Sequence, residues 1–334
     1  MLLAAGFGRR MVPVTLFRAK PALPFLNRPL ILRSLDALAA HGVTEAVVNL
    51  HHRPESLLPL LEAYPGLAVR TSKESELLGT SGGLARVADH FLRGGTFLVV
   101  NSDVVSDIDL TAAGEAHRAA GVEATLVLTP WRPNCGHTPV HHDGRRVLAF
   151  GGPPPPETAG RPPGIFTGVH LLEPSLLARL PEGPSEFLPA LYEPMIRSGN
   201  APGVHLTDAV WREVGRPAAY LAEQIEALAA TGDASLVLRG PGCRIDPGAR
   251  LGPGCILGAD VEVAAGCHLE ACVLMDGVKV GGEAQLAQVI AGPDTHLPAR
   301  CDLRLAVVDG GDPALPLVAA QPAVRWEGVW RADF

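Results

Sequence analysis

Glycine and basic residues are concentrated near the amino terminus, in the stretch GFGRRMVPVTLFRAKPALPF at residues 6–25. The stretch follows a short apolar run, MLLAA, which predicts a first β-strand. Gly6 and Gly8 allow the backbone to approach a polyphosphate closely and to aim successive amides at it, and Arg10 and Lys20 can neutralise its charge. The predicted chemistry is therefore the binding of phosphate groups. An ordinary glycine turn after a strand would have the same G-x-G spacing, so the two glycines alone do not decide between these interpretations.

The spacing of the whole stretch is more specific than its glycines. It resembles the signature of sugar-1-phosphate nucleotidylyltransferases, G-x-G-[ST]-R-[LM]-x-P-[LV]-T followed by P-K-P-x-x-P. Arg9 stands where Ser or Thr is usual, and Ala19 stands where Pro is usual. The resemblance implies that Arg10 and Lys20 are catalytic and stabilise the charge on the phosphates during transfer. The matching residues are Gly6, Gly8, Arg10, Met11, Pro13, Thr15, Lys20, Pro21 and Pro24.

A second block, LLGTSGGLARV at residues 77–87, resembles the L-G-T-[AGS]-G segment of the same family. In the family this segment lies against the nucleobase and ribose, and its glycines make room for the base. The alternative is an ordinary helix start with Thr80 or Ser81 as the N-cap. Across the two blocks, the resemblance implies nucleotide contacts by Leu3, Ala5, Gly6, Gly8, Gly79, Thr80, Ser81, Gly82 and Gly83.

Asp103 is implied as a magnesium ligand. It ends the run VVNSD, which matches the family's strand ending in G-D, with Ser102 in place of the glycine. At the carboxyl end of a buried strand, a hard oxygen ligand can meet Mg²⁺ that is bound to phosphate. The alternative is that Asp103 caps the following helix, although Asp107 and Asp109 are better placed for that role.

Glu213 is implied as the second metal ligand. The block WREVGRPAAYL at residues 211–221 resembles the family's W-x-D-[IV]-G-T-P-x-x-Y, in which the acidic residue is aspartate. Glutamate can bind Mg²⁺, but its extra methylene shifts the carboxylate in a site that requires near-octahedral geometry. The alternative is a surface acid in a turn.

The segments expected to bind the sugar depart most from the family pattern. Phe150 to Pro153 align with F-x-E-K-P, but Gly151 and Gly152 replace the glutamate and lysine. Thr167 and Gly168, in FTGVHLLEP, do match the usual sugar-contacting strand. Sugar binding is therefore expected at Thr167 and Gly168.

The order of apolar runs predicts how these residues are positioned. β-rich runs alternate with amphipathic stretches from residue 1 to about 130, which indicates a Rossmann-like, doubly wound α/β fold with a mostly parallel sheet. Such a sheet binds ligands at the carboxyl ends of its strands. A hairpin is expected at 138–150, turning at Asp143-Gly144, and a helix at 217–232 closes the domain. Strands are expected at 1–5, 45–50, 67–72, 96–103, 124–130 and from residue 164, and helices at 29–42, 54–64 and 81–94.

The periodicity changes beyond residue 236. Aliphatic residues recur every six positions, and Gly-Cys pairs recur every twelve, at 242–243, 254–255 and 266–267. This spacing predicts a short left-handed parallel β-helix of hexapeptide repeats, with a register slip near 275–277. We therefore expect a catalytic domain at 1–232, a β-helix at 237–300 and a tail at 301–334. The repeating aliphatics are Ile245, Leu251, Leu257, Val263 and Leu269.

Composition excludes several classes of function. A formal net charge of -7 argues against a general nucleic-acid binder, which needs a basic surface to displace counterions. No apolar run approaches the ~20 residues that span a bilayer, so a soluble, cytoplasmic protein is expected. The six cysteines include no C-x-x-C pair and are expected as reduced thiols.

The resemblance implies Mg²⁺-dependent transfer of a nucleotidyl group from a nucleoside triphosphate to a sugar 1-phosphate. L-G-T-S-G-G is nearest the branch of mannose-1-phosphate guanylyltransferase-like proteins, which carry a β-helix, and this favours GTP. Self-association through the β-helix is expected. The alternative function is a regulatory homologue that binds nucleotide sugar without making it, which Arg9, Gly151-Gly152 and Glu213 favour. A second alternative, an acyltransferase with a coil histidine as base, would use His268 or His296.

Overall fold

The computed structural model describes residues 1–133, 136–232, 235–310, 324–326 and 329–333. Contacts divide it into two compact units. The sheet unit comprises Met1–Gly6, Ile31–Pro54 and Leu58–Arg212, and the coil unit comprises Phe7–Leu30, Glu55–Leu57 and the chain from Glu213 onward. The sequence places residues 7–30 and 213–232 with the catalytic domain, whereas the contacts group both segments with the coils.

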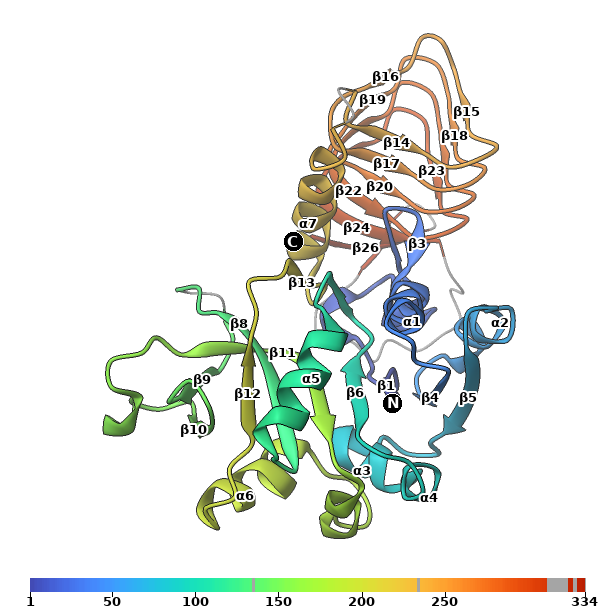
Figure 1. Cartoon of the computed structure of the whole chain (residues 1–334). Coiled ribbons are helices and arrows are strands. Elements are labelled where there is room, and N and C mark those ends of the chain that lie inside the picture. The colour runs from blue at the N-terminus through green and yellow to red at the C-terminus, as the bar shows by residue number, and fades with distance from the viewer. Residues whose placement is uncertain (134–135, 233–234, 311–323, 327–328, 334) are drawn as a thin grey trace. The chain divides into compact units, whose positions relative to one another are not determined.

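The sheet unit is built on a nine-stranded mixed sheet (Figure 1), in the order β10-β9-β11-β6-β1-β4-β5, with β8 beside β11 and β12 beside β8. The strands β1, β4, β5 and β6 are parallel to their neighbours in this group, as the α/β pattern predicts. In contrast, β11 runs antiparallel to β6, β8 and β9. The bounds are β1 (Leu2–Leu3), β4 (Glu45–Leu50), β5 (Ala68–Lys73), β6 (Phe97–Asn101), β8 (Ala124–Pro130), β9 (Pro139–His142), β10 (Val147–Phe150), β11 (Gly164–Leu172) and β12 (Gly203–Leu206).

Most expected helices of the sheet unit are present. The first, α1 (Leu30–Ala40), ends near Gly42, whose φ of +79° suits a glycine that stops a helix. The helix expected at 81–94 is instead two helices, α3 (Gly79–Ala85) and α4 (Ala88–Phe91). Asp109 caps α5 as predicted, because its side chain accepts from the Ala112 amide at 2.9 Å. The remaining helices are α2 (Leu58–Glu62), α5 (Leu110–Ala120) and α6 (Glu193–Arg197).

The core of the sheet unit contains a histidine among its apolar side chains. His170, on β11, is buried and hydrogen-bonds to the Tyr192 hydroxyl. Burial, with a smaller effect of the amino terminus, lowers the pKa of His170 to about 3. The ring is therefore neutral at physiological pH and belongs to the packing rather than to the chemistry.

The coil unit contains parallel strands that stack in successive turns of a β-helix, drawn in yellow to red in Figure 1. The five predicted aliphatics pack in one core cluster with buried Cys255 and Cys267. Leu251 pairs with Leu269, but Leu257 pairs with Leu274, so one interval is five residues long. The register slip therefore lies between Leu269 and Leu274, earlier than predicted. The strands are β14 (Val237–Arg239), β15 (Arg244–Ile245), β16 (Arg250–Leu251), β17 (Cys255–Leu257), β18 (Glu262–Val263), β19 (His268–Glu270), β20 (Val273–Leu274), β21 (Lys279–Val280), β22 (Gln285–Ala291) and β23 (His296–Leu297).

Parallel pairing continues beyond residue 300. Strand β24 (Asp302–Asp309) pairs in parallel with β22, and β26 (Val329–Asp333) pairs antiparallel with β24 and with β25 (Val324–Trp326). The end of the chain therefore packs back on the β-helix.

Helix α7 (Pro217–Ala229) begins with proline at a position that needs no amide donor. Cys243, Cys255, Cys267, Cys272 and Cys301 form no disulfide bond, and Cys135 lies outside the described residues.

Candidate functional site

The glycine-rich loop turns sharply at Gly8, in the coil unit. Gly8 has φ +62°, and a Cβ there would lie 3.1 Å from both Thr15 Cγ2 and Lys20 Cβ. The Thr15 hydroxyl donates to the Gly8 carbonyl at 3.0 Å, and the Met11 amide donates to the same oxygen at 2.9 Å. The positive φ and the close neighbours favour glycine at this turn, which brings Gly8, Thr15 and Lys20 together. Gly6, in contrast, would meet no atom within 4 Å if it carried a Cβ.

Arg10 and Glu213 face each other in the coil unit. Arg10 Nη2 lies 3.5 Å from Glu213 Oε1, and the two side chains are 53% and 29% exposed. The predicted catalytic cation therefore lies beside one predicted metal ligand. Arg9, the departure from the family pattern, is exposed, and its guanidinium lies 4.9 Å from the centre of the Phe7 ring. It stacks on an aromatic side chain of its own loop and does not crowd the turn.

Lys20 is buried, with 7% of its surface exposed, and it begins a short 3-10 helix at Lys20–Ala22. The Ala19 amide donates to the Ser56 hydroxyl at 2.9 Å, and the Leu23 amide donates to the Lys20 carbonyl at 3.0 Å. Ala19 occupies the position where the family has proline, and its amide makes a hydrogen bond that proline could not make. The backbone around Lys20 is thus fixed by hydrogen bonds on both sides.

The L-G-T-S-G-G block forms the first turns of α3, and its polar groups bond to residues 185–187. Thr80 Oγ1 donates to Glu186 Oε2 at 2.5 Å, and Ser81 Oγ, fully buried, donates to Ser185 Oγ at 2.8 Å. The amides of Ser81 and Gly82 both donate to the Ser185 carbonyl. Neither Thr80 nor Ser81 is the N-cap: that position is Leu78, without a side-chain cap.

Three glycines of this block are required by the protein's own packing. A Cβ on Gly79 would lie 2.5 Å from the Ser185 carbonyl oxygen, and one on Gly82 would lie 2.4 Å from that of Gly183. A Cβ on Gly83 would lie 2.8 Å from Asn49 Nδ2. The glycines therefore have a structural explanation that the sequence did not reveal, and their contacts with a nucleotide stay a prediction.

Replacing Gly79 by alanine should lower the free energy of unfolding by about 2 kcal/mol or more, because the residue has φ +72° and no room for a methyl group. Urea denaturation measures this loss. Gly95→Ala is the matched control, since Gly95 has no neighbour within 4 Å and no positive φ. Equal stability of the two variants would contradict the packing role.

Residues at the end of β1 bond to a buried polar network. The Ala4 amide donates to Asn49 Oδ1 at 2.8 Å, and Asn49 Nδ2 donates to Glu74 Oε1 at 2.8 Å. Ala5 is buried, and Leu3 is half-buried. Sequence reasoning missed Asn49, Glu74 and Glu186, because they belong to no recognised motif. The only signal for Asn49 and Glu74 is that each is a polar residue at or just beyond the carboxyl end of a predicted strand, and Glu186 has no such signal.

Asp103 lies in the turn between β6 and β7 (Val104–Ser106), at the carboxyl end of a strand as predicted. The Ser102 hydroxyl, where the family has glycine, donates to the Leu3 carbonyl at 2.6 Å. Ser102 therefore ties the Asp103 turn to the end of β1. Asp107 does not cap α5: its carboxylate accepts from the Val210 amide at 2.7 Å.

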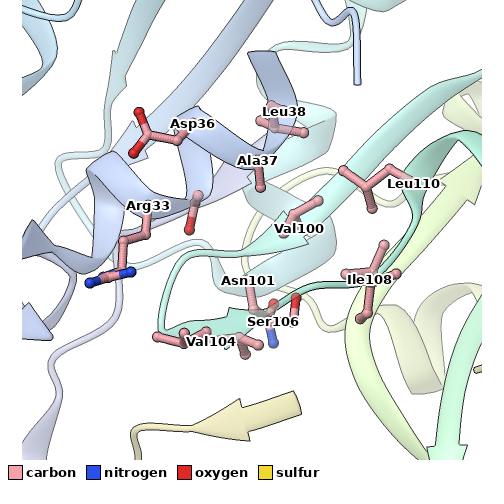
Figure 2. A pocket seen from close by; sticks show the side chains of 13 residues that line it. Arg33, Asp36, Ala37, Leu38, Val100, Asn101, Val104, Ser106, Ile108 and Leu110 are labelled. Atoms are coloured by element: carbon pink, nitrogen blue, oxygen red, sulfur yellow. The ribbon is translucent and has the colours of Figure 1, made fainter. Parts of the chain in front are cut away.

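A cavity of about 160 Å³ borders the Asp103 turn within the sheet unit. Figure 2 shows that one wall comes from α1, with Arg33 and Asp36, and the other from Asn101 and Val104 on either side of the turn. Asp103 itself does not line the cavity.

Thr167 and Gly168 lie at a bulge in β11, where its pairing with β8 is interrupted. Thr167 is fully buried and donates through Oγ1 to the Val127 carbonyl at 2.9 Å, and its own carbonyl accepts from Trp211 Nε1 at 2.9 Å. Gly168 has φ +79°, and a Cβ there would lie 2.6 Å from Asn101 Nδ2. The bulge thus aligns β11 with the end of β6, and a sugar contact at Thr167 or Gly168 stays a prediction.

The hairpin turn at Asp143-Gly144 is present as predicted. Gly144 has φ +95°, and the Asp143 carboxylate accepts from the amides of Arg145 and Arg146, both at 2.7 Å. These backbone hydrogen bonds lower the pKa of Asp143, although partial burial opposes the shift. Gly151 and Gly152, which replace the family's glutamate and lysine, both have positive φ and therefore suit glycine.

The described residues offer few side chains that could bind a metal ion together. In the described residues no three His, Cys, Asp or Glu side chains gather into a group that could hold a metal ion. Mg²⁺ in phosphoryl transfer is usually held by one or two carboxylates together with phosphate oxygens and water. Glu213 offers a partly exposed carboxylate for such a role.

Among the residues that the structure describes, no helix has the length and apolarity to cross a membrane.

Two family models and several curated proteins match the chain. The family model described as nucleotidyl transferase matches residues 1–229, and the model described as GMPPB C-terminal domain matches residues 234–314. A mannose-1-phosphate guanyltransferase of Neurospora crassa is 30% identical, over 93% of this chain and 91% of that protein. A probable mannose-1-phosphate guanylyltransferase 2 of Arabidopsis thaliana is 32% identical, over 87% and 85%.

The same fold occurs in a solved structure. The crystal structure of HddC from Yersinia pseudotuberculosis matches with a TM-score of 0.56 and 19% identity, over 68% of this chain and 97% of that one. A second crystal structure of HddC, complexed with GMP-PN, matches equally well. At this identity the likeness concerns the fold.

Proposed function

Because the chain belongs to the nucleotidyl transferase family, we propose that it transfers a guanylyl group from GTP to mannose 1-phosphate, giving GDP-mannose and pyrophosphate. The observation that carries the proposal is the loop geometry: the left-handed turn at Gly8 leaves little room for a side chain, and the same loop carries Arg10 and Lys20. Relatives named as mannose-1-phosphate guanylyltransferases, similar along nearly the whole chain, support the choice of base and sugar.

The reaction needs no covalent enzyme intermediate. A phosphate oxygen of the sugar phosphate attacks the α-phosphorus of the triphosphate in line, and the bond from that phosphorus to the bridging oxygen of pyrophosphate breaks. Catalysis is then mainly positioning and charge neutralisation. Arg10 and Lys20 neutralise the phosphate oxygens, and the amides that follow Gly6 and Gly8 bind them.

Mg²⁺ is the expected cofactor, with Asp103 and Glu213 as its protein ligands. When bound, it neutralises charge on the triphosphate oxygens. The Arg10–Glu213 pair is partly exposed and loosely spaced, so both side chains can exchange partners at small cost. Asp103 belongs to the sheet unit and Glu213 to the coil unit.

One observation favours a second candidate function, a regulatory homologue that binds nucleotide sugar without making it. Arg10 and Glu213, each expected to serve the phosphates or the metal, form an ion pair with each other. In a homologue without turnover, Arg10 and Glu213 would stay paired with each other and would bind neither phosphate nor metal. Lys20 and Asp103, which a sensor does not need, favour the enzyme.

Pyrophosphate release decides between the two. The full chain is incubated with Mg²⁺, each nucleoside triphosphate and a panel of sugar 1-phosphates, and the expected result is release that is greatest with GTP and mannose 1-phosphate and is abolished by EDTA. Release that requires another base or sugar would change the substrate assignment. Absence of release with every pair, combined with a thermal shift by GDP-mannose, would establish the regulatory function.

A further inference from the structure

The glycine-rich segment at residues 7–30, called the phosphate loop from here on, belongs to the same compact unit as the β-helix. The loop lies near one end of the chain and the coils near the other. Residues 7–30 group by their contacts with the chain from Glu213 onward. The Asn27 side chain donates through Nδ2 to the Leu257 carbonyl of β17 at 2.7 Å. The loop is therefore packed on the coils themselves.

A buried ion pair joins the loop to the late coils. Arg18 Nη1 lies 3.3 Å from Asp309 Oδ2, with the two side chains 15% and 0% exposed. Arg18 Nη1 also lies 3.8 Å from Met275 Sδ. Burial lowers the pKa of Arg18, and the Asp309 carboxylate opposes that shift. Removing one partner would leave the other charge buried, which is strongly unfavourable, so the pair fixes a position more than it adds stability.

The β-helix makes room for this pair at Gly292. A Cβ there would lie 1.8 Å from Asp309 Oδ2 and 3.1 Å from Arg18 Nη1. Gly292 does not have positive φ, so space is the reason for glycine at this position. Glycine at position 292 therefore leaves the space that the Asp309 carboxylate and the Arg18 guanidinium occupy.

The chain on both sides of Lys20 is bonded to the rest of the coil unit. Arg18 is two residues before it, and on the other side the Leu26 amide donates to Gln224 Oε1 at 2.8 Å. The Tyr220 hydroxyl donates to the Pro24 carbonyl, and burial raises the pKa of Tyr220, so the hydroxyl keeps its proton. Both Gln224 and Tyr220 are fully buried on α7. The segment that carries Lys20 is thus held by β24 before it and by α7 after it.

We propose that Arg18 and Asp309 are positioning residues: the β-helix, through this buried pair, holds the Lys20 segment in the geometry that transfer requires. The inference rests on the proposed function for the role of Lys20. The pair itself is independent of which base or sugar is used. It also gives the β-helix a part in catalysis within its own chain.

Hydrogen exchange tests the positioning directly. In Asp309→Asn, the amides of Leu16, Ala22 and Leu23, which are hydrogen-bonded within the loop, should exchange at least tenfold faster, while the core strand β8 exchanges as in the wild type. The matched control is Arg244→Met, which breaks an exposed ion pair with Glu262 elsewhere on the β-helix and should leave the loop unchanged. Unchanged exchange in the loop of Asp309→Asn would overturn the inference. This measurement needs no turnover, so it stands even if the proposed function fails.

Kinetics test whether the pair acts through Lys20. Asp309→Asn should lower kcat at least tenfold with little change in the KM for mannose 1-phosphate, but should have no further effect in a Lys20→Met background. Equal losses in both backgrounds would show that the pair does not act through Lys20. The double variant Arg18→Met with Asp309→Leu should recover thermal stability while kcat stays low and loop exchange stays fast. Full recovery of kcat in the double variant would show that the pair contributes stability only.

Discussion

Lys20→Met should lower kcat for pyrophosphate release by about 10²-fold or more, while the protein keeps its fold. Methionine keeps most of the apolar volume of this buried side chain but removes the charge that neutralises the phosphates. Since the positive charge acts most strongly on the charge that develops during transfer, kcat should fall more than KM rises. Initial rates of pyrophosphate release, together with thermal melting, measure the two effects separately.

The control for Lys20 is another cation of the same loop. Arg9→Ala removes an exposed guanidinium that stacks on Phe7, and turnover should stay near that of the wild type. Lys20→Ala should behave like Lys20→Met in kcat but be less stable, because it also leaves a cavity. A Lys20→Met enzyme that turns over at the wild-type rate would remove Lys20 from the mechanism.

Asp103→Ala should reduce turnover by about 10²-fold or more and raise the Mg²⁺ concentration needed for half-maximal rate. The reason is that a hard carboxylate oxygen at the end of β6 is lost from the expected ligand set. A titration of the rate with MgCl₂, at saturating GTP and mannose 1-phosphate, measures both changes.

Asp109 provides a control that separates the metal role from helix capping. Asp109→Ala removes the N-cap of α5 and should cost about 1 kcal/mol of stability, with turnover and Mg²⁺ dependence preserved. If Asp103→Ala loses stability to the same extent but keeps its rate and its metal dependence, then Asp103 is a structural residue and the metal assignment is wrong.

The sequence predicted much of the fold because its patterns are local. The strands at 45–50 and 124–130 were predicted with the bounds that the structure has, since both are buried apolar runs. The hexapeptide spacing likewise identified the inward side chains of the coils. The register slip was placed too late, because the change from Leu269 to Leu274 is a difference of one residue that only strand pairing reveals.

The candidate site was predicted less completely, because its supports come from distant parts of the chain. The motif indicated Gly8 and Lys20, and the structure gives the steric reason for Gly8. No pattern linked Arg18 to Asp309, or Thr80 to Glu186, since such pairs depend on tertiary packing and not on spacing. The same packing explains why Ser81 is buried, although the motif favoured it as a nucleotide contact.

The long sequence separation between the phosphate loop and its supports bears on how the protein is made. Arg18 and Met275 are 257 positions apart. On a ribosome adding about 5–20 residues per second, the loop leaves the exit tunnel tens of seconds before its partners exist. Nascent chains therefore carry this loop without the coil residues that contact it until translation is nearly complete. A chain that stops early would have the loop's sequence but not its final conformation.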